Sequence, residues 1–479
     1  MAAETRRAAS GLLKQPRSLA AALLLGAAVS QAVLDDGGFG PVPKLIFGGL
    51  ALAALAAAWA CDSAAAARAA RHPLAIVLGV LALFGAASAA WTTGAPGAAL
   101  RWGLATAGYG AVLVASQVVS RRPRGQVGIA ILIVLLAAIS GLVGLWAAAA
   151  FVTPEANHTT GFWRPAGMLG YSSALSVLQI SALPAILTWM HDRRLAVSAA
   201  AAFAGAVAAV VLALDQSRLE SVLAVLVCAV ALRWPAATVR QPRRRVAASL
   251  GLLALAAAGA YIVAGRKVSY LAHTHQLPRT TGLAAILIAT AVVWALARAA
   301  ERSGPERRHE RRMRLAAIGA VLALTAGIVT FTAIEGDTSH VVYVQNGGFF
   351  HGRLGIWSQA LNTATQRILW GHGADSSLIS TPVPEPGEAI PDAHDLPLEM
   401  WVELGIPGLA LALLAYWTSL KAIWDARLQH NFWTFGPAAI AFPLAVLLDW
   451  EWHLPGSAAI WTLALGALIA RRGVQDMVF

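Results

Sequence analysis

The chain has 479 residues, of which 58% are hydrophobic and 13% charged, and its formal net charge is +12 at pH 7. This composition is too apolar for a soluble globular protein and indicates an integral membrane protein. The apolar residues form long continuous runs, whereas a transmembrane β-barrel has short segments of alternating hydrophobicity. Because backbone groups in lipid must be hydrogen-bonded internally, the sequence predicts an all-α integral membrane protein.

Apolar runs of roughly 16 to 25 residues, near the length that crosses a bilayer as a helix, recur along the chain. They predict a polytopic helical bundle of about 12–14 transmembrane helices, with re-entrant segments among the weakest. The sequence leaves open whether residues 246–264 and 281–299 are both full spans. The candidate spans are residues 18–33, 45–61, 73–91, 98–118, 128–151, 168–190, 195–214, 219–234, 246–264, 281–299, 315–335, 397–424, 432–449 and 456–471.

The first of these runs, residues 18–33, follows a basic segment as the hydrophobic region of a signal peptide would. We interpret it as a retained helix, because the next run begins near Leu45 and no cleavage site followed by a soluble domain separates them. The two cysteines, Cys61 and Cys228, lie within or at the end of apolar runs. Neither a disulfide framework nor a metal site is expected from them.

The basic residues are distributed unequally between the two sides of the predicted membrane topology. Roughly three quarters of the 36 lysines and arginines fall on the side that holds both termini, which the positive-inside rule assigns to the cytoplasm. This rule, together with contact with anionic membrane lipids, accounts for the positive net charge. Nucleic-acid binding is therefore not expected.

One long polar interruption, residues 336–396, falls on the opposite side and divides the chain into residues 1–335, 336–396 and 397–479. The first and last parts are predicted to be transmembrane helices, and the middle part a large loop. The interruption holds widely spaced histidines that no cysteine or HExxH sequence joins, so neither a metal nor another cofactor is expected. These histidines are His340, His351, His372 and His394.

Residues 353–370 within this interruption have apolar side chains at helical spacing, with polar residues between them. The pattern predicts an amphipathic helix that lies in the membrane interface. The sequence WGHGAD, residues 370–375, is expected to end this helix. A proline-rich segment then predicts irregular structure before the next span.

Three arginines on the non-cytoplasmic side are candidate phosphate ligands. Arg164 precedes the span 168–190, Arg218 lies in a short turn between two spans, and Arg353 begins the amphipathic helix. A guanidinium group stays charged and binds two phosphate oxygens at once. The alternative is that these side chains reach toward lipid phosphates or pair with neighbours such as Asp215 or Glu220.

His394 is the candidate base. Asp395 is predicted to cap the following helix and Pro397 to occupy its first turn, which holds His394 at the membrane boundary. A neutral imidazole there can accept a proton from a hydroxyl group. Glu399 and Glu403, on one helix face, are predicted to orient His394 or an arginine, or to bind sugar hydroxyls. The alternative is that His394 is a solvated loop histidine.

These motifs, in this order, resemble those of the O-antigen ligase and O-antigen polymerase superfamily. The resemblance runs from about Arg164 to Leu411 and implies a metal-independent glycosyltransferase of the bacterial inner membrane. Both termini would be cytoplasmic and the large loop periplasmic. The sequences that carry the resemblance are RPAGMLGYSSAL at Arg164, SRLES at Arg218, GRLGIWSQAL at Arg353, WGHGAD, and AHDLPLEMWVELGIPGLAL at His394.

The resemblance implies a glycan donor linked to undecaprenyl pyrophosphate and an acceptor hydroxyl, with lipid A–core as the first choice. It implies that Arg218 and Arg353 bind the pyrophosphate, that His394 deprotonates the acceptor, and that Arg164 contacts phosphate or glycan. His351 and Asp395 would be supporting residues. Polymerisation of O-antigen or exopolysaccharide, and glycan transfer to protein, are the alternatives within the superfamily.

The chain departs from the family pattern in two respects. Asp395 stands where the family often has asparagine, and the pair of spans 246–264 and 281–299 lies between Arg218 and Arg353. A transporter or flippase is the competing class of protein. It would be expected to place ionisable or broken helices at mid-membrane, whereas the charged residues here cluster at the outer ends of spans.

Overall fold

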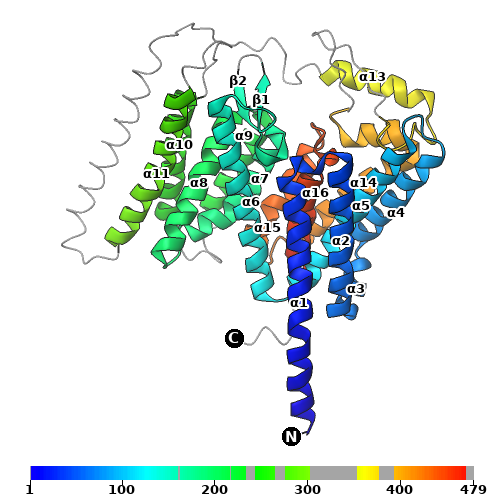
Figure 1. Cartoon of the computed structure of the whole chain (residues 1–479), viewed down its shortest axis with the longest axis horizontal. Helices are drawn as coiled ribbons and strands as arrows, with labels where there is room; N and C mark the ends of the chain where they lie inside the picture. Colours follow the sequence, from blue (N-terminus) through cyan, green and yellow to red (C-terminus); the bar gives the residue numbers. More distant parts are fainter. Residues whose placement is uncertain are drawn as a thin grey trace. The chain divides into compact units, whose positions relative to one another are not determined.

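The computed structural model describes residues 2–159, 162–215, 217–233, 243–264, 276–301, 353–376 and 393–470. In this part of the chain the fold is almost entirely helical, and the sheet is a single two-stranded hairpin (Figure 1). Nine of the described helices are long and apolar enough to cross a membrane. Four shorter apolar helices are Ser18–Leu34, Leu219–Val230, Phe432–Ala445 and Pro455–Ile469. The prediction of an all-α polytopic membrane protein is confirmed.

Each predicted span that falls in the described residues coincides with a helix. The span 315–335 lies outside them. Contacts between residues divide the chain into two units, one comprising Met1–Leu132 with Val344–Phe479 and the other Ile133–Tyr343. The division at 336–396 inferred from the sequence stays a prediction, and each unit is described separately below.

The first unit joins the N-terminal helices to the C-terminal ones. Proline occupies the first turn of α2, α4, α5, α14 and α16, where a missing N–H costs no hydrogen bond. Helix α5 packs against α2, α4 and α16, and α16 is buried along its length. The helices of this unit are α1 (Ala2–Leu34), α2 (Pro41–Cys61), α3 (Ser63–Ala70), α4 (Pro73–Ala87), α5 (Pro96–Val119), α13 (Arg353–Gln366), α14 (Leu396–Ala426), α15 (Phe432–Ala445) and α16 (Pro455–Ile469).

The second unit is organised around α7 (Ser172–Trp189), which is buried on nearly all sides. It packs on α8 (Leu195–Asp215), whose alanines and glycine permit the close helix contacts typical of membrane proteins. A hairpin of β1 (Ala156–Thr159) and β2 (Phe162–Pro165) precedes α7, with Asn157 opposite Arg164. The other helices are α6 (Pro123–Ala150), which begins in the first unit, α9 (Arg218–Arg233), α10 (Arg243–Ala264) and α11 (Gln276–Glu301).

Helix α14 is interrupted at Gly405, which has φ 67° and ψ −162°. Pro407 follows and cannot donate a hydrogen bond to the carbonyl of Glu403. The backbone groups that lose their helical partners at this break form hydrogen bonds with residues 367–376. We call this segment, which follows α13, the strap. Glu403 O accepts from Gly373 N at 2.7 Å, Val402 O accepts from His372 N at 3.0 Å, and Ile406 N donates to Ile368 O at 2.9 Å.

The glycines of WGHGAD permit this close contact between the strap and α14. Gly371 has φ 63°, and a Cβ atom there would lie 2.3 Å from the carbonyl oxygen of Glu403. Gly373 has φ 100° and lies directly against Thr92. Side-chain-bearing residues rarely adopt these conformations. The predicted amphipathic helix is present but shorter than 353–370, since α13 ends at Gln366, before WGHGAD begins.

Candidate functional site

His394 lies immediately before the cap of α14 and contacts a residue far away in the sequence. Asp395 caps α14 by accepting a hydrogen bond from Leu398 N at 2.8 Å, as predicted. His394 has φ 51°, a backbone conformation uncommon in non-glycine residues. Its Nδ1 lies 3.0 Å from Oδ1 of Asp449, 55 positions along the chain. The imidazole therefore has a buried carboxylate partner.

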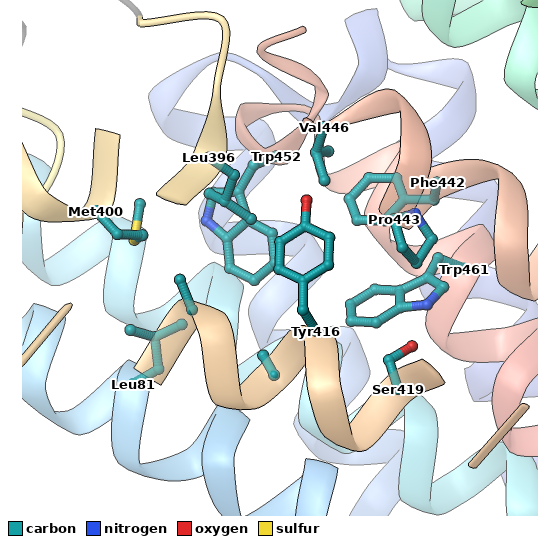
Figure 2. A pocket seen from close by; sticks show the side chains of 12 residues that line it. Leu81, Leu396, Met400, Tyr416, Ser419, Phe442, Pro443, Val446, Trp452 and Trp461 are labelled. Carbon is teal, nitrogen blue, oxygen red and sulfur yellow. The ribbon is translucent and has the colours of Figure 1, made fainter. Parts of the chain in front are cut away.

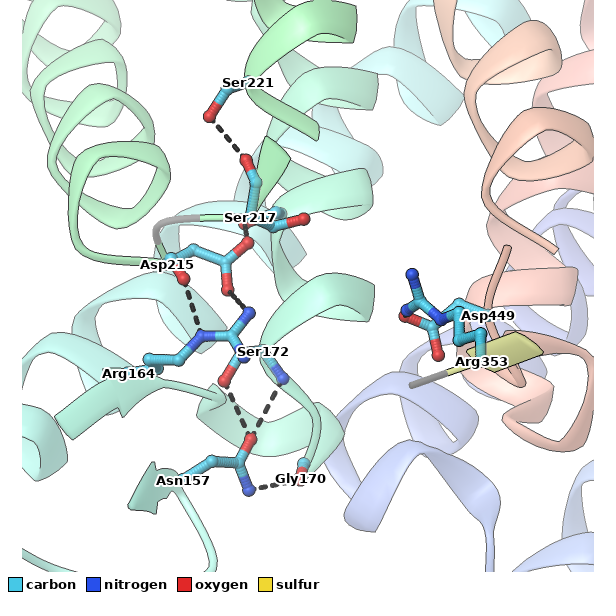
Figure 3. A network of polar contacts seen from close by, with 10 residues as sticks. Asn157, Arg164, Gly170, Ser172, Asp215, Ser217, Ser221, Arg353 and Asp449 are labelled. Atoms are coloured by element: carbon cyan, nitrogen blue, oxygen red, sulfur yellow. Dashed lines mark hydrogen bonds and ion pairs between the residues drawn. The ribbon is translucent and has the colours of Figure 1, made fainter. Parts of the chain in front are cut away.

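Arg353 is brought to the same carboxylate by the packing of α13 on α14. A small apolar cluster of Ile356, Ala360 and Ala364 packs on Ala393 and Val402. This contact places Nη2 of Arg353 3.6 Å from Oδ2 of Asp449 (Figure 3). The Asp449 side chain is 4% exposed, whereas those of Arg353 and His394 are 23% and 17% exposed. The arginine and the histidine therefore remain accessible on either side of a buried acid.

The geometry of the pair determines which imidazole nitrogen is available. A neutral imidazole that donates from Nδ1 to the Asp449 carboxylate carries its free lone pair on Nε2. The same arrangement of base and orienting acid supports proton abstraction in other enzymes. His394 can therefore act as a base through Nε2, with Arg353 supplying positive charge nearby.

The glutamates of α14 have partners other than His394. Glu399 is hydrogen-bonded to Nε2 of His453, and both side chains are nearly fully buried. Glu403 is buried and faces Glu399, His453 and Asp375. The pKa of the capping Asp395 is raised, mainly by burial and further by the charge of Glu399, although the hydrogen bond from Leu398 lowers it.

The other two candidate arginines belong to the second unit. Arg164, on β2, donates from Nε to the carbonyl of Asp215 and from Nη2 to its carboxylate, each at 2.6 Å (Figure 3). Burial disfavours the charged guanidinium, but the Asp215 carboxylate more than offsets this and raises the pKa of Arg164. Ser176 also donates to this carboxylate. Arg164 is thus engaged in the pairing with Asp215 that the sequence offered as its alternative role.

Arg218, predicted to lie in a turn between two spans, is the first residue of α9. Its side chain and the whole of His351 lie outside the described residues. In the hairpin, Asn157 accepts hydrogen bonds from the backbone and hydroxyl of Ser172, which ties the hairpin to the start of α7 (Figure 3).

An apolar pocket lies next to the segments that carry His394 and Asp449. Leu396 and Val446, which are joined by a backbone hydrogen bond of 2.9 Å, form part of its wall. The Tyr416 hydroxyl is directed into this space (Figure 2). The pair therefore lies at a boundary between polar side chains and the apolar interior. The remaining lining residues are Leu81, Met400, Ala412, Ala415, Ser419, Phe442, Pro443, Trp452 and Trp461.

Sequence reasoning did not identify Asp449 or His453. Both belong to the sequence LLDWEWHLPG between α15 and α16, in which Asp449, Glu451 and His453 stand between two apolar helices. Such a concentration of ionisable residues at the end of a span was a usable signal. Within the described ranges, no group of three or more histidine, cysteine or acidic residues is arranged to hold a metal ion.

The fold and the site define a class of protein: a polytopic α-helical membrane protein with a histidine–aspartate pair and an arginine at the end of a membrane helix. Comparison with known families specifies it further. A family model described as O-Antigen ligase matches residues 277–413, which include Arg353 and His394. The match confirms the resemblance to the O-antigen ligase superfamily that the motifs predicted. No curated protein sequence matches the chain significantly.

Proposed function

We propose that the protein transfers a glycan from undecaprenyl pyrophosphate to an acceptor hydroxyl at the periplasmic face of the bacterial inner membrane. Lipid A–core is the proposed acceptor, which makes the reaction an O-antigen ligation. The match to the O-antigen ligase family supports glycan transfer in general. The observation that carries the proposal is the meeting of His394 and Arg353 at the buried carboxylate of Asp449.

In the proposed reaction, the acceptor oxygen attacks the anomeric carbon of the lipid-linked sugar while Nε2 of His394 takes the hydroxyl proton. The bond from the anomeric carbon to the pyrophosphate oxygen breaks, and its electron pair leaves on the pyrophosphate. The configuration at the anomeric carbon is inverted. Arg353 stabilises the departing charge, as preorganised cations do in phosphate sites. Binding of the pyrophosphate by Arg218 stays a prediction from the sequence.

Arg164 has a supporting role in this proposal. Its ion pair with Asp215 fixes the hairpin against the end of α8, so we assign it to shaping the glycan-facing surface more than to holding pyrophosphate. No step of the reaction is assigned to a metal or another cofactor. Both termini are proposed to be cytoplasmic, and a reporter fused within 377–390 is expected to be found in the periplasm.

The break in α14 bears on the competing class, since transporters use broken helices to bind substrates. Here the backbone groups freed at Val402, Glu403 and Ile406 are hydrogen-bonded to the strap. The break therefore serves to anchor the strap, and transport is not proposed.

The test is reconstitution of the purified protein in vesicles with an undecaprenyl-pyrophosphate-linked glycan. One reaction contains lipid A–core, a second contains only further lipid-linked glycan, and a third contains an acceptor protein. Glycosylated lipid A–core in the first reaction is the expected product. Elongated lipid-linked glycan would indicate a polymerase, and glycosylated protein a protein O-oligosaccharyltransferase. Movement of the donor across the vesicle membrane without any transfer would overturn the proposal.

A further inference from the structure

A second group of ionisable side chains is buried behind the His394–Asp449 pair, in the same unit. The imidazole of His453 is hydrogen-bonded through Nε2 to Glu399, and its Nδ1 lies 3.9 Å from Oδ1 of Asp375. The other oxygen of Asp375 lies 3.3 Å from Nζ of Lys44. The side chains of His453, Glu399 and Lys44 are 2%, 4% and 7% exposed. The Asp375 side chain is 22% exposed, so these four residues form a continuous chain of contacts that is buried at Lys44, His453 and Glu399 and partly exposed at Asp375.

The chain of contacts joins segments that are far apart in the sequence. Lys44 belongs to α2, Asp375 to the strap after α13, Glu399 to the first turns of α14, and His453 to the 3-10 turn η5 (Glu451–His453). The proposed catalytic pair adjoins two of these segments. His394 precedes Asp395, the cap of α14, and Asp449 precedes Trp450, the cap of η5.

The contact between Glu399 and His453 therefore joins the two segments next to the pair, as the hydrogen bond from Leu396 N to Val446 O also does. On one side, Asp395 and Glu399 belong to the same helical turn, since Glu399 N donates to Asp395 O at 2.9 Å. On the other side, His453 N donates to Trp450 O at 3.1 Å, and Trp450 N donates to Oδ1 of Asp449 at 2.9 Å. Short hydrogen-bonded links thus connect Glu399 to Asp395, the residue next to His394, and connect His453 through Trp450 to Asp449.

Neither Glu399 nor His453 is placed to touch a substrate, because both side chains are almost completely buried. Burying a carboxylate and an imidazole is costly unless they are paired, and an apolar contact would hold two segments together as well. The use of an ionisable pair here, beside a site that needs defined geometry, points to a role in orientation.

We propose that Glu399 and His453 are positioning residues for the transfer reaction: they clamp η5 against α14 and so keep Asp449 hydrogen-bonded to His394. The inference rests on the proposed function. The Lys44–Asp375 ion pair supports the clamp from the strap side. In the clamp, Glu399 serves as a hydrogen-bond acceptor for His453, and its effect reaches the substrate only through Asp449 and His394.

The test compares Glu399→Ala and Glu399→Gln in the reconstituted transfer assay, with initial rates measured over a range of donor concentrations. Removal of the clamp in Glu399→Ala should lower kcat by about 10- to 100-fold, as loss of an orienting partner does, with the donor KM nearly unchanged. Glu399→Gln keeps a carbonyl acceptor for His453 and should retain kcat within about threefold. The matched control is Asp62→Ala, which removes the ion pair with Arg121 and the cap of α3; it should leave kcat unchanged.

Wild-type kcat in folded Glu399→Ala would overturn the inference, and so would a Glu399→Gln variant as impaired as Glu399→Ala. If Glu399→Ala does not fold, His453→Leu, which removes the donor to Glu399, decides the question: a lowered kcat with an unchanged KM supports the clamp, and a wild-type kcat refutes it. His394→Ala is measured in parallel. If His394→Ala is active, the proposed base is refuted. If His394→Ala is inactive and Glu399→Ala is fully active, only the clamp is refuted.

Discussion

Replacement of Asp449 by asparagine separates the electrostatic role of this residue from its packing. The side chain is 4% exposed and lies 3.0 Å from Nδ1 of His394 and 3.6 Å from Nη2 of Arg353. Asparagine has nearly the same size but can offer an amide N–H to Nδ1. The imidazole would then carry its proton on Nε2, where it cannot accept another from the acceptor hydroxyl.

The expected loss follows from the chemistry that is removed. General-base catalysis contributes about 10²- to 10⁴-fold to a rate, so kcat of Asp449→Asn should fall by about that factor. The longer contact with Arg353 involves a partly exposed side chain and is worth about 1 kcal/mol or less, so the donor KM should change only a few-fold at most.

The assay is transfer of labelled glycan by the reconstituted variant, with insertion and thermal unfolding measured on the same preparation. Asp425→Asn is a suitable control, because Asp425 forms an exposed ion pair with Lys421 on α14, away from the site. It should have wild-type activity. A folded Asp449→Asn enzyme with kcat within about threefold of wild type would refute the assignment of His394 and Asp449 as a functional pair.

Three further predictions concern the scaffold. Gly371→Ala should destabilise the protein by about 1–3 kcal/mol, because the residue has a positive φ and touches the backbone of α14. The control is Gly355→Ala, in open space on α13, which should stabilise the protein slightly. Equal unfolding temperatures for the two variants would refute this reasoning. Arg164→Ala should cost about 3–5 kcal/mol by removing the charge partner of the buried Asp215 carboxylate, which keeps only neutral donors such as Ser176. Asp215→Asn in the same chain should recover part of that loss in thermal unfolding. Burial raises the pKa of Asp395, so its charge destabilises the folded state as the pH rises through that pKa. Asp395→Asn, which can still cap α14, should raise the unfolding temperature at neutral pH, and the gain should shrink toward about pH 4; a gain independent of pH would contradict this reasoning.

Features set by neighbouring residues could be predicted from the sequence. The apolar runs located the helices, and the spacing within residues 353–370 identified α13. Asp395 and Pro397 identified the start of α14, because capping and first-turn preferences act within a few residues. Gly405 and Pro407 lie two residues apart, a pattern that predicts a break in a helix, but the break in α14 was not predicted from it.

Features that depend on which loops meet could not be predicted in the same way. Asp449 reaches His394 because α14 and α15, which lie between them in the chain, return it to the same end of the first unit. A single sequence does not specify which loops come together in the fold. Glu399 was therefore expected to orient His394 or an arginine, whereas its hydrogen-bond partner is His453. The pairing of Arg164 with Asp215 was named only as an alternative for the same reason.

The most direct measurement of the central claim is the rate of glycan transfer by His394→Ala, in vesicles that contain lipid-linked glycan and lipid A–core. Binding of the donor should be retained, because Arg353 remains in place. The proposed mechanism predicts a fall in kcat of about 10²-fold or more with normal insertion and folding. Transfer at the wild-type rate by the folded variant would contradict the assignment of His394 as the base.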